Sequence, residues 1–435
     1  MRRFIATIAL VGFTLGLTAV VAEGQEASQA QKLTIANAER IANANHPRIT
    51  IAQLQELIER EGVREVRAPE LPQAAAYLTA VDAEDNSRIT AGLLNNPTLY
   101  SRAAAGLTVS QLITDFGRTH HLVKSAQLTD EARKSALTAT QEEVRLVVDR
   151  AFLQALIEQR LQQIAEQTVA ARQTLDDEVT ALTRAKLKST LDQSIADTEL
   201  SVAELHLVDA QTDACNAMFD LEELLGISGG TEIVLVDGDD SLEMPLNLDA
   251  QQLIVQAYHN RPDLAVLLRE EAAAYQLKLA EHNLERPTIQ AMAVAGDAPV
   301  RADGIAKAWY GAAGVNISIP LLNGARFSAR AMEADLAEQQ AHAHIVEQRQ
   351  LIERDLRKTL ANAQAAYQKI AVTEQILEQA NLALELATTR YKLGLSNMVE
   401  LNDAQNAQIA AQIGAANARY SYRIWSAELR FQTGE

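Results

Sequence analysis

The stretch Leu33–Pro47, LTIANAERIANANHP, returns later in the chain as Leu248–Pro262, LDAQQLIVQAYHNRP. The two closing prolines lie 215 residues apart. Gly106–Arg118, GLTVSQLITDFGR, corresponds in the same way to Gly314–Arg326, GVNISIPLLNGAR, with a shift of 208 that persists through the rest of each copy. A common register over so many residues indicates an internal duplication, and this duplication decides the architecture.

Each copy is predicted to begin with the same three elements. A helix of roughly 25 to 35 residues starts near Leu33 or Leu248 and ends at a proline, because proline cannot continue a helix interior. Two strands follow, one of each pair marked by alternating apolar and polar residues. The four predicted strands lie near Gln73–Ala80, Leu107–Ser110, Ile289–Ala295 and Val315–Pro320.

After its strands, each copy is almost purely helical for about 100 residues. Apolar residues recur there at steps of three, four or seven, which predicts coiled-coil packing. They are Leu146, Leu153, Ile157 and Ile164 in the first copy, and Leu356, Leu360, Ala363, Tyr367, Ile370, Leu377 and Leu384 in the second. Breaks at Ala185–Ser189 and at Leu393–Asn397 divide each helical stretch into a long hairpin.

The chain divides into four predicted segments. Residues 1–22 have the pattern of a secretory signal peptide: two arginines, an uncharged apolar run and small residues at its end. Residues 23–226 form the first structural repeat, residues 227–247 a linker, and residues 248–435 the second repeat. Val234–Val236 in the linker is expected to pair as a short strand.

The composition excludes several classes of function. The net charge of -18 repels phosphate backbones, so no nucleic-acid partner is expected. No phosphate-binding glycine loop, zinc-hydrolase helix motif or nucleophile elbow occurs, so we expect neither an enzyme nor a cofactor. The pairs His120-His121 and His342/His344 are predicted to be solvated rather than to hold a metal. Cys215 is the only cysteine, which rules out a disulfide within the chain.

The four strands imply an assembly of more than one chain. Every backbone amide in hydrocarbon needs a partner, and barrels made by a single chain begin at about eight strands. The strands must therefore be completed by other copies of the chain if they cross an outer membrane. Three copies supply twelve strands, although the need to pair every backbone amide does not by itself select three.

The chain resembles the TolC family of outer-membrane ducts over essentially its whole mature length. The resemblance rests on the order and duplication of several strings, among them Arg67–Pro72, Gln111–Arg118, Ile319–Arg326, Arg390–Leu395 and Asn402–Gln405. It implies a mostly α-helical fold with a small β part. The two coiled-coil hairpins of each chain join a trimeric α-barrel, which continues into a shared 12-stranded outer-membrane β-barrel.

The resemblance also implies a function and partners. The expected protein is a homotrimer that sits in outer-membrane lipid and extends into the periplasm. It passively conducts cargo in a tripartite efflux pump or a type I secretion system. Its expected partners are a periplasmic adaptor protein and an inner-membrane pump of the RND, ABC or MFS type.

By the same resemblance, the functional residues lie at the hairpin tips. Glu400 and Asp403 correspond to two acidic rings at a periplasmic aperture. Tyr391 and Asp192 correspond to a pair that holds this aperture closed. At Ser396, well-known family members carry an arginine, so the charged part of the link is missing or is supplied by Lys186 or Lys188. The expected adaptor-docking surface is formed by Leu187, Leu393, Gly394 and Leu395.

Two other readings remain open for the sequence. The first is a periplasmic coiled-coil scaffold without a membrane barrel, in which the strand segments are loops. The second is the adaptor protein itself. Solvated acids on a helix face and ordinary helix packing are the corresponding structural explanations for Glu400, Asp403 and the tip leucines.

Overall fold

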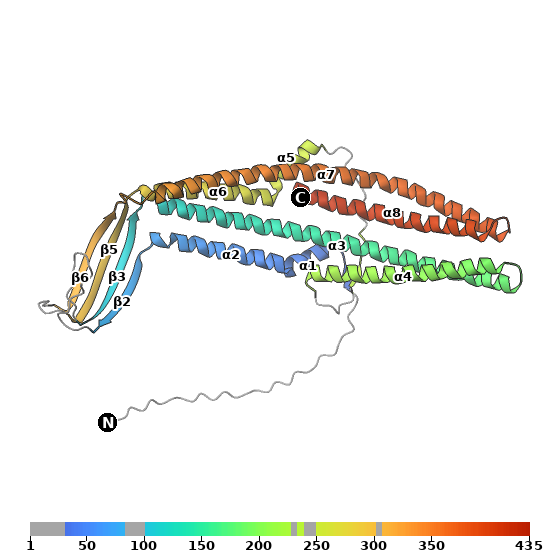
Figure 1. The fold of residues 1–435 in the computed structure, drawn as a ribbon, viewed down its shortest axis with the longest axis horizontal. Helices are drawn as coiled ribbons and strands as arrows, with labels where there is room; N and C mark the ends of the chain where they lie inside the picture. The colour runs from blue at the N-terminus through green and yellow to red at the C-terminus, as the bar shows by residue number, and fades with distance from the viewer. Residues whose placement is uncertain (1–30, 83–100, 228–232, 239–248, 302–306) are drawn as a thin grey trace, which may run out of the picture.

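The computed structural model describes residues 31–82, 101–227, 233–238, 249–301 and 307–435 (Figure 1). The predicted signal peptide lies outside these residues. The first copy contains α1 (Ile35–Asn45), α2 (Pro47–Arg67), β2 (Gln73–Val81), β3 (Arg102–Thr114), α3 (Arg118–Arg184) and α4 (Thr190–Leu225). The second contains α5 (Ala250–Asn260), α6 (Pro262–His282), β5 (Thr288–Val300), β6 (Trp309–Ser318), α7 (Arg326–Lys392) and α8 (Met398–Thr433). The two copies repeat one order of elements.

The first helical part of each copy differs from the prediction. A single helix of 25 to 35 residues ending at a proline is wrong, because the structure has an 11-residue helix followed by a 21-residue helix. Pro47 and Pro262 begin the second helix of each pair. The first turn of a helix has no intrahelical partner for its N–H groups, so proline fits there.

The four predicted strands form one antiparallel sheet in the order β2-β3-β5-β6. The two copies meet in its centre, where Thr108 of β3 is paired with Val294 of β5. Strands β2 and β6 are the edges, and their side chains are exposed along almost their entire length. Tyr310 lies across Gly106 and Gly296, where any Cβ would collide with its hydroxyl group. The sheet therefore has two unpaired edges within the described chain.

The helices form an elongated array with the sheet at one end and the two hairpin tips at the other (Figure 1). In this array α3 is central, since it packs against α2, α4, α6 and α8. Helix α7 packs against α6 and α8 and lies on the side opposite α2 and α4. The helices α3 and α7 each have 67 residues, a length of about 100 Å.

The hydrophobic core consists of separate clusters along the length of the helices instead of a single cluster. Phe152, Leu153 and Leu221 lie in a cluster where α1, α3 and α4 meet. A second cluster joins α5 to α7 around Ile352 and Leu356, and a third lies near the tips. Beside the first cluster, β1 (Gln31–Leu33) pairs in parallel with β4 (Ile233–Leu235), so the predicted strand of the linker does form.

None of the described helices combines the length and the apolar character needed to cross a membrane.

Candidate functional site at the hairpin tips

The two tips have the same backbone conformation although their sequences differ. Lys186 adopts a left-handed φ of 61° at the first tip, and Gly394 has a φ of 71° at the second. The following helix is capped at each tip: Ser189 accepts from the Asp192 N–H at 3.1 Å, and Asn397 accepts from the Glu400 N–H at 2.9 Å. Both predicted breaks are therefore tight helical turns with capped restarts.

The two predicted acidic residues lie on the first turns of α8, and both are exposed. Glu400 Oε1 accepts from Arg390 Nε at 2.9 Å, across the turn of the same hairpin. Arg390 and Glu400 both remain about half exposed, so this surface ion pair contributes little to stability. Asp403 lies less than one turn beyond Glu400.

Tyr391 lies in the apolar cluster between the two hairpins and is 4% exposed. Its hydroxyl has no hydrogen-bond partner within the described chain. Burial raises the pKa of Tyr391, with a further contribution from the charges of Asp192 and Glu178. Asp192 itself is used in the cap, where its carboxylate accepts from the Ser189 hydroxyl at 2.9 Å. The predicted Tyr391–Asp192 hydrogen bond is thus not made within one chain and stays a prediction for an assembly.

Lys188 supplies a direct contact between the two tips. Its ammonium nitrogen lies 3.9 Å from the centre of the Tyr391 ring, a cation–π geometry. Lys188 belongs to the first hairpin and Tyr391 to the second. The Lys188 ammonium group of the first tip therefore contacts the ring of the residue that the family resemblance assigns to the closing pair.

The tip leucines project into solvent. Leu187, Leu393 and Leu395 are 71%, 68% and 65% exposed. A Cβ at Gly394 would meet no atom within 4 Å. Packing within the chain therefore does not account for these leucines, which form a small apolar surface at the end of the molecule.

A buried arginine on α3, which sequence reasoning missed, connects the two hairpins. Arg172 is 3% exposed and donates to Asn402 at 2.6 Å, to Asn406 at 2.7 Å and to Gln405. It also pairs with Glu199 of α4 at 3.4 Å, and Asn402 donates to Glu199 at 2.8 Å. These residues are called the Arg172 cluster. The only signal in the sequence is the i, i+3, i+4 spacing of the three amides, which places them on one face of α8.

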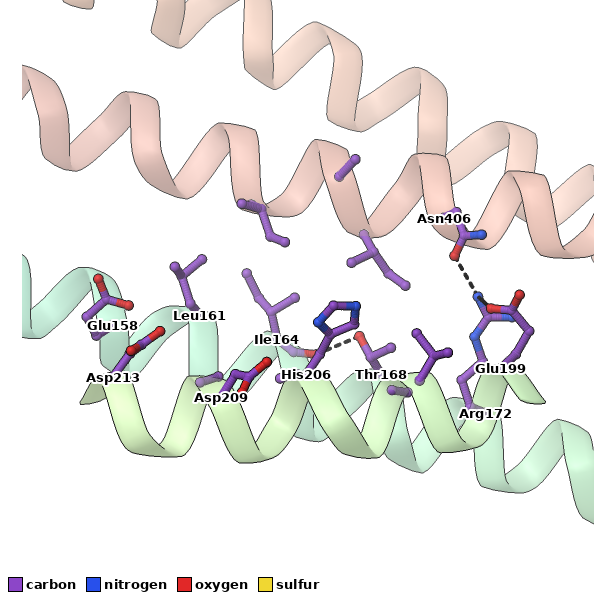
Figure 2. A pocket seen from close by; sticks show the side chains of 17 residues that line it. Glu158, Leu161, Ile164, Thr168, Arg172, Glu199, His206, Asp209, Asp213 and Asn406 are labelled. Atoms are coloured by element: carbon purple, nitrogen blue, oxygen red, sulfur yellow. Dashed lines mark hydrogen bonds and ion pairs between the residues drawn. The ribbon is translucent and has the colours of Figure 1, made fainter. Parts of the chain in front are cut away.

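A groove of about 600 Å³ adjoins the Arg172 cluster and is enclosed by α3, α4 and α8 (Figure 2). Apolar side chains, including Leu161 and Ile164, line it together with acidic side chains and His206. The acids among its lining residues are Glu158, Glu199, Asp209 and Asp213. Among the described residues, no three His, Cys, Asp or Glu side chains are arranged to hold a metal ion.

Comparisons with known proteins agree with this architecture. The model of the family described as "outer membrane efflux protein" matches residues 25–227 and 253–435. The outer membrane efflux protein BepC of Brucella suis is 24% identical over 343 residues, covering 76% of this chain and 71% of BepC.

Solved structures show the same fold. A structure of CusC superposes with a TM-score of 0.79 at 20% identity and covers 92% of each chain. The outer membrane protein VceC of Vibrio cholerae superposes with a TM-score of 0.76 at 18% identity, covering 92% of this chain and 96% of VceC. The family and the fold are those of channels rather than of enzymes. The chain belongs to the outer membrane efflux protein family, and it is an efflux duct of the outer membrane that extends into the periplasm.

Proposed function

We propose that three copies of this chain form a closed duct that passively conducts cargo from a periplasmic adaptor protein and an inner-membrane pump to the exterior. The pump is of the RND, ABC or MFS type, in a tripartite efflux system or a type I secretion system. The main support for this proposal is that both long sides of a single chain carry an unpaired strand edge and exposed apolar side chains. The boundaries 23–226, 227–247 and 248–435 are proposed for its two repeats and their linker.

In the sheet, these two sides are the unpaired strand edges. Strand β2 forms one edge and β6 the other, so β6 of one copy can pair with β2 of the next. Such a head-to-tail contact joins different surfaces and closes a ring when its rotation allows. Three copies provide twelve strands, the number that the family resemblance implies.

In the helical part, the same two sides carry exposed apolar side chains. On α4, Leu205, Val208 and Phe219 are 60%, 59% and 63% exposed. On α7, Ile376 and Leu386 are 51% and 56% exposed. These apolar residues lie on helices at opposite sides of the array (Figure 1). Exposed apolar stripes of this kind mark interfaces, and the partner proposed here is the next copy of the same chain.

The tips form the periplasmic entrance in this proposal. Glu400 and Asp403 from three copies provide six carboxylates around the aperture, which favours cations. Tyr391 and Asp192 hold the aperture closed, with Lys188 supplying the charge that is absent at Ser396. The exposed Leu187, Leu393, Gly394 and Leu395 receive the adaptor protein.

The test uses the full mature protein extracted in detergent. Native mass spectrometry should give a mass of three chains, and planar bilayers should show discrete, cation-selective conductance steps. A monomer without conductance would contradict the duct. A periplasmic scaffold would fractionate with soluble periplasmic proteins, whereas the duct should fractionate with outer membranes.

A further inference from the structure

We propose that the groove between α3, α4 and α8 binds an organic cation with an apolar body, and that this groove opens to the lumen of the duct. The luminal placement rests on the proposed function, because it needs a closed ring. The groove itself is formed by one chain, so binding can be measured separately from the ring. Its lining, its charge and its counterpart in the duplicated copy support the assignment.

The groove has the size and the lining of a small-molecule site. Its volume of about 600 Å³ lies within the range of pockets that hold small ligands. All three helices contribute apolar side chains to it: Leu161 and Ile164 from α3, Val202 from α4, and Ile409 and Ile413 from α8. Val202 is 42% exposed and Ile413 is 36% exposed, so opposite walls present apolar surface. An apolar body bound between these walls would be removed from water on both sides.

One end of the groove carries acidic side chains that make no ion pair within the described residues. Glu158, Asp209 and Asp213 lie together there (Figure 2). Arg172 is the only arginine or lysine among the lining residues, and its charge is already taken up by the Arg172 cluster at the other end. His206 also lines the groove and makes no ion pair with these acids within the described chain. A ligand with a positive charge therefore complements the groove, and an anion is repelled.

The duplication shows that the helices form without this charge. With the shift of 208 residues, all three acids correspond to uncharged residues of the second copy: Glu158 to Ala366, Asp209 to Asn417, and Asp213 to Ser421. Helices α4 and α8 nevertheless have the same length of 36 residues. The acids are therefore not needed to build the hairpin, and the binding of a cation gives them a function.

The groove opens on the side of α3 opposite to β4. A second hollow, on the other side, is lined by Leu235 of β4 and by Gln163 of α3. Leu161 of the groove and Gln163 of this hollow are two residues apart, which is about 200° around the helix. In a closed ring, elements packed on the inner face would obstruct the passage, so the face that carries β4 is the outer one. The groove therefore faces the lumen, and its copies surround the passage at one level.

The first test uses probes that separate charge from apolar surface. Tetraphenylphosphonium is a cation with aryl groups, tetraphenylborate is an anion of the same shape, and tetramethylammonium is a cation without aryl surface. Equilibrium dialysis against the full mature protein in amphipol gives each dissociation constant, with empty amphipol as the blank. The affinity for tetraphenylphosphonium should exceed that for either other probe by at least about tenfold.

The second test removes the features of the groove one at a time. Asp209→Asn with Asp213→Asn should weaken the binding of tetraphenylphosphonium at least about tenfold, because the complementary charge is lost. Ile413→Ala should weaken it several-fold without changing the binding of tetramethylammonium, because only apolar surface is removed. Glu204→Gln with Glu222→Gln is the matched control, since it removes two charges from the same helix outside the groove, and it should change neither affinity.

Planar bilayers test the luminal placement. Tetraphenylphosphonium should lower the conductance of the wild type more than that of the Asp209→Asn, Asp213→Asn variant, because a cation held inside the lumen narrows the passage and repels other cations. Equal block of the two proteins, combined with a difference in their binding by dialysis, would place the groove outside the lumen.

The outcomes separate this proposal from the proposed function. A monomeric protein that binds tetraphenylphosphonium through Asp209 and Asp213 supports the groove, but it overturns the ring and with it the luminal placement. A conducting trimer that binds the phosphonium and the borate equally overturns only the groove as a cation site. The same holds for a conducting trimer whose affinity for the phosphonium is unchanged by the loss of both aspartates.

Discussion

Glu400 and Asp403 are the residues through which the proposed entrance acts on its cargo. Replacing them together by Glu400→Gln and Asp403→Asn keeps their size and removes six charges from the ring of three copies. The permeability ratio for cations over anions should fall, because the fixed negative charge that concentrates cations is lost. The reversal potential across a salt gradient in planar bilayers measures this ratio. Glu385→Gln, an exposed acid on α7, serves as the control.

Asp149 is a buried carboxyl group whose protonation makes stability depend on pH. It is 3% exposed, and its Oδ1 atom has no hydrogen-bond partner. Burial first, and then the charge of the nearby Glu39 and a hydrogen bond with it, raise the pKa of Asp149 from 3.8 to about 7 against the opposing charges of Arg430 and Arg145. Between about pH 4 and pH 7 the folded protein therefore keeps a proton on Asp149 that the unfolded chain has already released. Stability contributed by this group is lost as the pH rises through that window.

This pH dependence predicts a stabilising substitution. Asp149→Asn should raise the melting temperature by several degrees at pH 8, where the wild type carries a buried charge, and by much less at pH 5. Thermal unfolding of detergent-solubilised protein at the two pH values measures the difference. Glu166→Gln is an exposed acid-to-amide control on the same helix. An equal effect of Asp149→Asn at both pH values would show that the charge is not responsible.

The sequence marked individual residues only where a local pattern or the family resemblance singled them out. Gly394 stood out because it lies in a predicted break of the helix, and the acids of α8 were named from the resemblance. Arg172 was not marked, because it contacts Asn402 from 230 positions away and no periodicity relates the two. The sequence named Lys188 only as one of two lysines that could supply the missing charge of the closing link. Its contact with the Tyr391 ring was not predicted, since that geometry depends on how two separate hairpins are placed.

At the scale of elements, the two tips share one backbone conformation. The residue with the left-handed φ is Lys186 at the first tip and Gly394 at the second. A non-glycine residue in the left-handed region is strained by about 1 kcal/mol, and glycine is not. Lys186→Gly should therefore slow hydrogen exchange in the last turn of α3, and Gly394→Ala should accelerate exchange in the last turn of α7. Hydrogen–deuterium exchange by mass spectrometry resolves both segments. Lys188→Gly changes the same tip without a positive φ and should not slow exchange.

The helices after the strands were predictable because their apolar spacing persists over many turns. The first helical part was not, since a proline can either end a helix or begin one. Thr34 and Asp249, which cap α1 and α5, mark one helix start. The second start has a proline at its beginning in both copies, and a side-chain cap, from His46, only in α2. The pairing of β4 with β1 was also outside the reach of local patterns, because its partner strand has only three residues.

At the scale of the whole molecule, the two open sides predict how assembly can be blocked. Leu205→Glu places a charge on the exposed apolar stripe of α4, so the trimer should dissociate to monomers. Leu393→Glu introduces the same change at a tip leucine outside this stripe and should leave the trimer intact. Native mass spectrometry of both variants compares the two. A trimeric Leu205→Glu protein would exclude α4 from the contact between chains.

The unpaired edges of β2 and β6 also affect how the duct is made. A solitary subunit cannot lower its free energy by entering lipid, because two rows of amides would lose water without gaining partners. Insertion and association must therefore be a single event, with a rate that rises more steeply than linearly with subunit concentration. Newly exported chains at low abundance should accumulate as water-soluble precursors. Their unpaired strand edges would need to be protected from aggregation until enough further subunits are present.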